Sequence, residues 1–145
     1  MPEFDEATAV RWDAVVPAVA GATGVAHGHL DEGWAIGHAI NGGVLMATAT
    51  SAASEVLSSV GHPDVLTWGA HFLSAARPGP LQVDLEVLRV GRGASTATVR
   101  LRQPEDDGLV ERVHVTGTFG TLDRAEPVHR APAPPSMPDP DSCVP

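Results

Sequence analysis

The sequence predicts an α+β domain in which one long central helix is wrapped by a five- or six-stranded antiparallel sheet. Two observations lead to this prediction. A segment of small and apolar residues follows Asn41 and carries no charge before Glu55, and four alternating apolar segments follow between about residues 65 and 119. A helix with so few charged residues has to be covered on most sides. We therefore expect the sheet to curl around it.

The central helix is expected from about residue 42 to residue 60. Asn41 is a good N-cap, and Gly61 followed by Pro63 is typical of a helix end. One stripe of this helix should face the inner side of the sheet. The stripe comprises Leu45, Ala49, Ala52 and Val56, and the residues expected to face it are Trp68, Phe72, Val83, Leu85 and Val99.

The four later segments are predicted as strands of an antiparallel meander, because the turns at 77–80, 91–93 and 104–108 are too short for crossover helices. Alternation places Leu66 with Trp68 on the inner face, and Arg112 on the outer face opposite Val113. The alternating phase breaks at Leu88, which predicts a bulge there.

The chain divides into a domain of residues 1–122 and a proline-rich tail of residues 123–145. The segment 23–40 is expected to hold one or two short strands, and the first twenty residues fit either a short helix or an extended arm. The last 19 residues contain seven prolines and no apolar period, which is linker composition. A linker of this kind suggests that another domain once followed it.

Composition excludes several classes of protein. A formal net charge of −9 and the lack of any lysine argue against nucleic-acid binding as the main role. Cys143 is the single cysteine, so it forms no internal disulfide. It also lacks a nearby basic residue that would activate its thiol. No apolar run reaches the ~18 residues of a membrane span, and the acidic N-terminus is unlike a signal peptide. We expect a soluble cytoplasmic protein.

The start of the central helix is the main candidate site. Free N–H groups at a helix start can hold an anion or a developing oxyanion, and glycines allow close approach. The alternative is an ordinary cap whose glycines serve helix–sheet packing. Both interpretations remain open from the residues alone.

Six short motifs occur in the order and spacing of a known family. They are Asp31-Glu32-Gly33-Trp34, Asn41-Gly42-Gly43, His71-Phe72-Leu73, Arg77-Pro78-Gly79-Pro80, Gly91-Arg92-Gly93-Ala94-Ser95-Thr96 and Arg102-Gln103. With them the chain resembles the N-terminal half of the acyl-CoA thioesterase II-like (TesB-like) family, which is built as a double hotdog. The resemblance covers roughly residues 4 to 122 and implies the hotdog fold.

The resemblance implies site residues for thioester hydrolysis. Asn41 and Gly43 would be catalytic, by polarising the thioester carbonyl. His38, Gly42, Arg92 and Gly93 would bind substrate, with the Arg92 guanidinium suited to the phosphates of coenzyme A. In that family the catalytic Asp, Thr and Gln lie mainly in the C-terminal hotdog, which this chain lacks. In single-hotdog thioesterases an acidic residue lies about two turns into the helix, and the corresponding residue here is Thr50.

Other candidates are weaker. Asp31 and Glu32 are the only paired carboxylates near the helix start and are more simply solvated turn residues. His27 and His29 would share one strand face, which is too few ligands for a metal, so no metal site is predicted. No cofactor is predicted either, since coenzyme A enters as part of the substrate.

The predicted function is hydrolysis of an acyl-CoA thioester, of a fatty or other acyl group, to the free acid and coenzyme A. Two alternatives remain. In the first, the chain is a non-catalytic acyl-binding or structural half of a double-hotdog protein. In the second, which is less favoured, it is an enoyl-CoA hydratase-type hotdog. The expected partner is a second hotdog, as a homodimer or as the missing C-terminal domain, because a lone hotdog leaves sheet edges uncovered.

Overall fold

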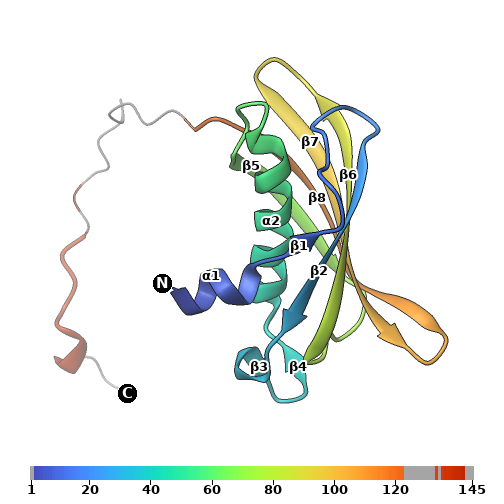
Figure 1. Cartoon of the computed structure of the whole chain (residues 1–145). Coiled ribbons are helices and arrows are strands. Elements are labelled where there is room, and N and C mark those ends of the chain that lie inside the picture. Colours follow the sequence, from blue (N-terminus) through green and yellow to red (C-terminus); the bar gives the residue numbers. More distant parts are fainter. Residues whose placement is uncertain (1, 123–132, 134, 143–145) are drawn as a thin grey trace.

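The computed structural model describes residues 2–122, 133 and 135–142. Helix α2 (Gly42–Ser58) lies along one face of a curled antiparallel sheet (Figure 1). The other elements, in chain order, are α1 (Pro2–Thr8), β1 (Arg11–Trp12), β2 (Thr23–Leu30), the 3₁₀ turn η1 (Glu32–Trp34), β3 (Ala35–Ile36), β4 (Ala39–Ile40), β5 (Asp64–Phe72), β6 (Gly79–Val90), β7 (Ala94–Glu105), β8 (Gly108–Gly120) and the 3₁₀ turn η2 (Pro140–Ser142).

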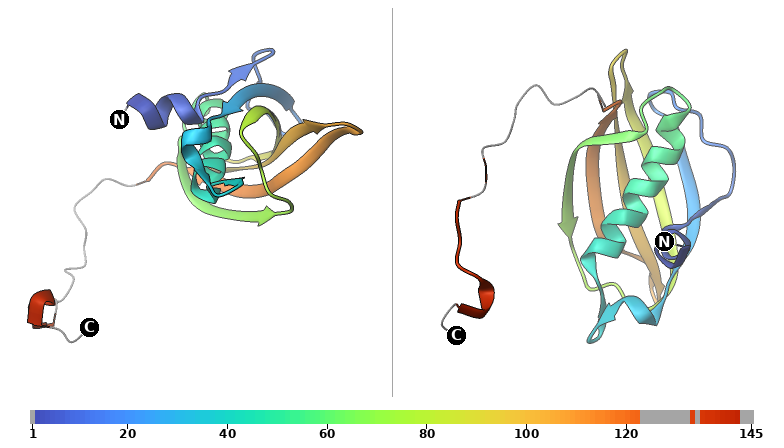
Figure 2. Two further views of the ribbon diagram at one scale, coloured as in Figure 1. Left: turned by 90° about the horizontal axis from the view of Figure 1, so that it is seen from below. Right: turned by 90° about the vertical axis from the view of Figure 1, so that its left-hand side faces the viewer.

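The main sheet has six strands in the order β1-β2-β6-β7-β8-β5, and all of its pairings are antiparallel. β3 and β4 form a separate two-stranded hairpin just before α2. The sheet bends around the helix, as the view along the helix shows (Figure 2). The predicted arrangement, one long helix wrapped by a six-stranded antiparallel sheet, is therefore confirmed.

The predicted limits of the central helix are confirmed to within two residues. Asn41 is the N-cap. At the other end Gly61 has a left-handed φ of 79°, the N–H of Gly61 donates to the carbonyl of Ser58 at 3.0 Å, and the N–H of His62 donates to the carbonyl of Leu57 at 3.1 Å. This pair of bonds is the Schellman ending that glycine permits.

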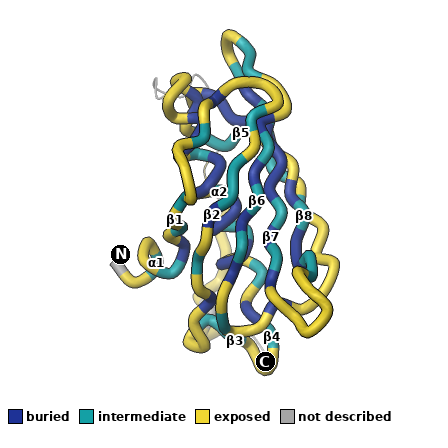
Figure 3. The backbone as a smooth tube through the Cα atoms, turned by 45° about the vertical axis from the view of Figure 1, so that its right-hand side comes forward, coloured by how far each residue is buried: buried dark blue, intermediate teal, exposed yellow. Residues whose placement is uncertain are grey.

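The inner stripe of α2 is buried as predicted, and so are Val83, Leu85 and Val99 opposite it. Buried stretches follow β6 and β7 along the backbone (Figure 3). Trp68 is half-buried and meets Phe119 edge-on, with ring centroids 5.2 Å apart. Phe72 also faces α2, where its ring lies against Gly42, but its side chain is 55% exposed. Phe72 is the last residue of the edge strand β5, at the start of the helix.

The bulge predicted at Leu88 is confirmed by a register shift between Val87 and Arg89. Two further shifts break the predicted alternation. One lies at Leu66, which is exposed rather than turned inward. In the other, Leu101 pairs with Val113 but Arg102 pairs with Glu111, so Arg112 is the extra residue of β8. A bulge re-aims the side chain it carries, and Arg112 is buried on the inner side rather than exposed on the outer face.

The N-terminal segment combines both structures that the sequence left open, since the short helix α1 is followed by an extended arm that includes β1. Phe4 of α1 packs edge-on against Trp34 at 5.7 Å. Cys143 lies outside the described residues, and the tail at 123–145 remains a prediction. Among the described residues, no helix is both long enough and apolar enough to cross a membrane.

Candidate functional site

At the start of α2, some hydrogen-bond donors are engaged in the helix cap and others are free. The side-chain oxygen of Asn41 accepts the N–H of Gly43 at 2.7 Å, and the Asn41 carbonyl accepts the N–H groups of Val44 and Leu45 at 3.2 and 3.4 Å. Within the described part of the chain, neither the Gly42 N–H nor the Asn41 side-chain NH₂ has a hydrogen-bond partner. The donors available to a ligand are therefore these two groups, while the Gly43 N–H is engaged in the cap.

Phe72 lies directly beside this helix start. A Cβ atom placed on Gly42 would come within 3.1 Å of two ring carbons of Phe72. Glycine thus allows the close approach of the aromatic ring, which would have to shift slightly to make room for a Cβ atom. Since Phe72 is half-exposed, its ring forms an apolar wall next to the free Gly42 N–H.

The β3–β4 hairpin directly precedes the helix start. His38 is exposed in its turn, next to Gly37 with a φ of 66°. The hairpin is joined to the helix start because the N–H of Asn41 donates to the carbonyl of Trp34 at 2.9 Å. His38 and Asn41 therefore lie at the same end of the molecule.

Asp31 serves as a cap rather than as a free base. Its carboxylate accepts the N–H of Gly33 at 2.7 Å and begins the η1 turn. Asp31 and Glu32 are both exposed. This geometry matches the simpler of the two interpretations offered by the sequence.

Arg92 and Gly93 lie at the opposite end of α2. They form the β6–β7 turn, and Ser95 just after the turn contacts His62 beyond the helix C-terminus at 2.8 Å. Seventeen helical residues span about 26 Å. Within one chain, Arg92 and Asn41 do not belong to the same site.

The Thr50 hydroxyl is engaged within its own helix. It donates to the carbonyl of Met46, one turn earlier, at 2.7 Å. The only charged residue of α2 is Glu55, which lies beyond Thr50 toward the helix C-terminus. The helix therefore presents donors at its start and no carboxylate base near them.

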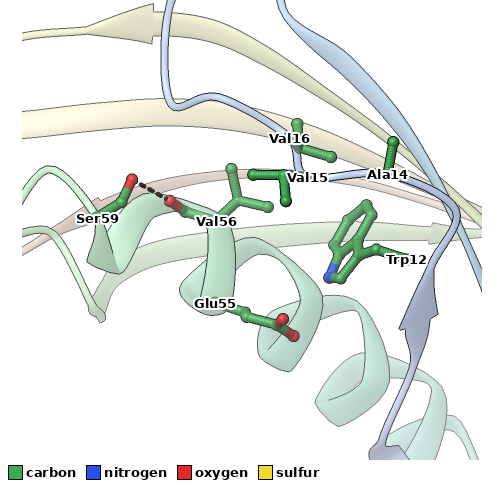
Figure 4. A pocket seen from close by; sticks show the side chains of 7 residues that line it. All are labelled: Trp12, Ala14, Val15, Val16, Glu55, Val56 and Ser59. Carbon is green, nitrogen blue, oxygen red and sulfur yellow. Dashed lines mark hydrogen bonds between the residues drawn. The ribbon is translucent and has the colours of Figure 1, made fainter.

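A groove of about 500 Å³ runs between the segment 12–16 and the last turns of α2 (Figure 4). Trp12, Val15 and Val16 line one side, and Glu55, Val56 and Ser59 line the other. The groove lies toward the helix C-terminus, away from Asn41, and none of the predicted site residues lines it.

No metal site was predicted for His27 and His29, the two histidines of β2. His27 pairs with Asp13 at 3.3 Å, and His29 is exposed. The part of the chain that the structure describes holds no group of three His, Cys, Asp or Glu side chains suited to a metal ion. A bound metal therefore has no ligand set among these residues.

Sequence reasoning missed two buried polar pairs. Gln103 of β7 and Arg112 of β8 bind the loop at 73–80, which includes the first two residues of β6, and Ser95 of β7 binds His62. Arg112 was missed because the bulge reverses its direction. The Arg102-Gln103 motif gave a signal for Gln103, but its spacing did not reveal what the amide binds.

Comparison with known proteins assigns this chain to a family. The acyl-CoA thioesterase N-terminal domain family matches residues 30–120. The chain belongs to this family. An uncharacterized protein of Mycobacterium tuberculosis strain H37Rv is 32% identical over 111 residues, which cover 74% of this chain and 35% of that protein.

Two solved structures are similar along nearly the whole chain. A candidate thioesterase II of Thermobifida fusca YX superposes with a TM-score of 0.73 at 30% identity, covering 97% of this chain and 47% of that one. A hot dog fold protein of Alicyclobacillus acidocaldarius gives a TM-score of 0.71 at 23% identity, with 96% and 47% covered. The fold of this acyl-CoA thioesterase domain is the hotdog, and the chain spans less than half the length of these relatives.

Proposed function

We propose that this chain is the acyl-CoA-binding and carbonyl-polarising half of a thioester hydrolase. The observation that carries the proposal is the start of α2, where the Gly42 N–H and the Asn41 amide are free beside an exposed apolar ring. Donors fixed at a helix start stabilise an oxyanion better than the neutral carbonyl. Membership of the acyl-CoA thioesterase family supports a thioester as the group polarised.

The proposed reaction is ordinary thioester hydrolysis. Water adds to the thioester carbonyl carbon while a carboxylate base accepts its proton. The oxyanion that forms is held by the Gly42 N–H and the Asn41 NH₂. It then collapses with cleavage of the carbon–sulfur bond, which releases coenzyme A as the thiolate and the acyl group as the carboxylic acid.

In this proposal the base comes from a second hotdog. Thr50 is bonded to its own helix, and Asp31 is occupied as a cap. A non-catalytic role for this half is therefore the second candidate function, and the engaged Thr50 hydroxyl favours it. A hydratase role is less favoured, because it needs an Asp and His pair on the helix, and α2 carries neither residue.

The second hotdog is expected to pair with β5. This strand is at the edge of the sheet, and among the described residues no strand pairs with its free side. Leu66 and Phe72 on β5, and Leu73 just after it, are exposed. An unpaired edge with apolar side chains is a template for another strand.

Antiparallel pairing through β5 would complete the site. The strand runs from Asp64, at the end nearest the β6–β7 turn, to Phe72, at the end nearest Asn41. In a twofold pair, Asp64 of one copy lies near Phe72 of the other. Arg92 of the partner subunit, two strands or about 10 Å in from that edge, would then lie on the side of Asn41, where coenzyme A phosphates need a positive group.

Three measurements test this proposal. A thiol-release assay over acyl-CoA chain lengths should show turnover if the chain pairs with itself into a working site, with enoyl-CoA absorbance as the test for hydration. Sedimentation should show a dimer that Leu66→Lys weakens, since a lysine on an edge strand opposes pairing. A dimer without turnover would favour the non-catalytic half, and a strict monomer would contradict self-pairing.

A further inference from the structure

Two sequence motifs have no part in the proposed chemistry. They are the Arg77-Pro78-Gly79-Pro80 turn and the Arg102-Gln103 pair. The structure joins them. The Gln103 side chain reaches from the inner face of β7 into the loop that connects β5 with β6.

Gln103 is only 4% exposed and uses all its hydrogen-bonding capacity. Its oxygen accepts the N–H of Arg77 at 2.9 Å and the Nε–H of Arg112 at 3.3 Å. Its nitrogen donates to the carbonyls of Arg77 at 2.7 Å and of Pro80 at 3.2 Å. Two of these partners only donate and two only accept, so the amide has one possible orientation.

Arg112 extends this network to the other half of the loop. The β8 bulge turns its guanidinium inward, where its side chain is 7% exposed. One nitrogen donates to the Ser74 hydroxyl at 3.1 Å, and another pairs with Glu105 at 2.5 Å. The Arg112 carbonyl also accepts the N–H of Leu73 at 2.8 Å. We call Gln103, Arg112 and their bonds to Ser74 and Arg77 the Gln103–Arg112 clip.

The clipped loop is bonded to the start of α2. The carbonyl of Ala76, a buried residue between Ser74 and Arg77, accepts the N–H of Ile40 at 2.8 Å. Ile40 is itself buried and directly precedes Asn41. Phe72, which lies against Gly42, comes immediately before the loop. The loop therefore contacts the helix start through both Ile40 and Phe72.

We infer that Gln103 and Arg112 are positioning residues that fix the α2 start through the loop at 73–80. This inference rests on the proposed function for its catalytic purpose, because neither side chain contacts Asn41 or Gly42. A buried amide with four satisfied bonds has a single geometry. A hydrogen-bond donor that is only slightly displaced from its place beside the oxyanion loses most of its effect on the reaction rate.

Ser95 provides a matched control. It lies on the same strand, is fully buried, and binds His62 just beyond the C-terminus of α2. Ser95→Ala thus removes a buried polar bond at the far end of the same helix. Gln103→Met removes the Gln103 bonds of the clip at the near end and keeps the length of the side chain.

The experiment is amide hydrogen exchange on the full chain, combined with steady-state kinetics. In Gln103→Met, exchange of the Ile40 amide should accelerate by about tenfold or more, because Arg77 and Pro80 lose buried partners. The kcat should fall by about tenfold while KM changes little. In Ser95→Ala, the His62 amide should accelerate instead, with the Ile40 amide and kcat at wild-type values.

Gln103→Glu keeps an acceptor for Arg77 and Arg112, and should give intermediate exchange and kcat. It also serves if Gln103→Met does not fold. Unchanged Ile40 exchange in the Gln103 variants would overturn the inference, and so would equal acceleration in Ser95→Ala. If the wild-type chain has no turnover, the proposed catalysis fails for this chain alone, while the exchange comparison still decides whether the clip positions the helix start.

Discussion

The two ends of α2 differ in how their polar groups are satisfied. At the C-terminus the carbonyls of Leu57 and Ser58 accept Schellman bonds, and the Gly61 carbonyl accepts the Thr121 hydroxyl at 2.6 Å. At the N-terminus the Gly42 N–H and the Asn41 NH₂ have no partner within the described residues. Near each end a buried polar side chain of β7 makes hydrogen bonds, Ser95 to His62 beyond the C-terminus and Gln103 to the loop that bonds Ile40 before the N-terminus. The two ends therefore differ in the first turn, where two donors have no partner among the described residues.

The largest expected effect separates capping from polarising at the N-terminus of α2. Asn41→Asp keeps an oxygen that caps the Gly43 N–H and removes the NH₂ donor. We expect kcat to fall by about 10²–10³-fold, as for loss of one oxyanion donor, with no loss of thermal stability because aspartate caps as well as asparagine.

Asn41→Ala is the companion variant, measured by the same kinetics and thermal melts. It should lose the activity and also about 1 kcal/mol of stability. A wild-type kcat in Asn41→Asp would show that the α2 start is only a cap. The free donors at this end of the helix would then have no catalytic role.

The second prediction concerns which end of α2 supplies the positive charge that binds the coenzyme A phosphates. If the site is shared across a β5 pair, Arg92→Ala should raise KM for acyl-CoA by about ten- to 100-fold, with kcat nearly unchanged. Loss of a charge-assisted bond has this size, and phosphates bind equally in the ground and transition states.

Arg77→Ala is the control for a site confined to one chain. Arg77 is exposed and is the arginine nearest in sequence to Ala76, which bonds Ile40 before the helix start. A rise in KM for Arg77→Ala, with none for Arg92→Ala, would contradict the shared site and leave the fold intact.

The sequence predicted the parts of this comparison that depend on local chemistry. Asn41 as a cap, Gly61 as the helix end and the bulge at Leu88 follow from residue type and phase. Arg112 did not, because a bulge in β8 is invisible in a strand that otherwise alternates well. The separation of Arg92 from Asn41 was missed for another reason. Both are turn-like, glycine-flanked sites, and only the direction of the strands shows that the helix holds them apart.

The third prediction compares glycines at the two ends. A Cβ on Gly91 would lie 2.7 Å from the carbonyl oxygen of Ala94, a backbone atom at the start of β7. A Cβ on Gly42 would meet only the half-exposed ring of Phe72 at 3.1 Å. Gly91→Ala should therefore cost about 1–3 kcal/mol of unfolding free energy. Gly42→Ala should cost less than about 1 kcal/mol, since the ring can turn away and alanine favours a helix. Denaturant unfolding measures both, and an equal cost would mean that Phe72 is as fixed as the backbone.

The smallest expected effect lies between the two ends, at Thr50. Its hydroxyl is bonded to the Met46 carbonyl, which the helix already satisfies through the Thr50 N–H, so the side-chain bond is a supplement. Thr50→Val keeps the branched shape and a similar helix propensity. We expect kcat to stay within about twofold of the wild type and unfolding free energy to change by roughly 0.5–1.5 kcal/mol, the range for one hydrogen bond. Kinetics and denaturant unfolding on the same sample check both values. A loss of 10²-fold or more in kcat with stability retained would place a catalytic hydroxyl in the middle of the helix. The base would then not need to come from a second hotdog, and the α2 start would share its role with a residue that this structure shows turned back onto its own backbone.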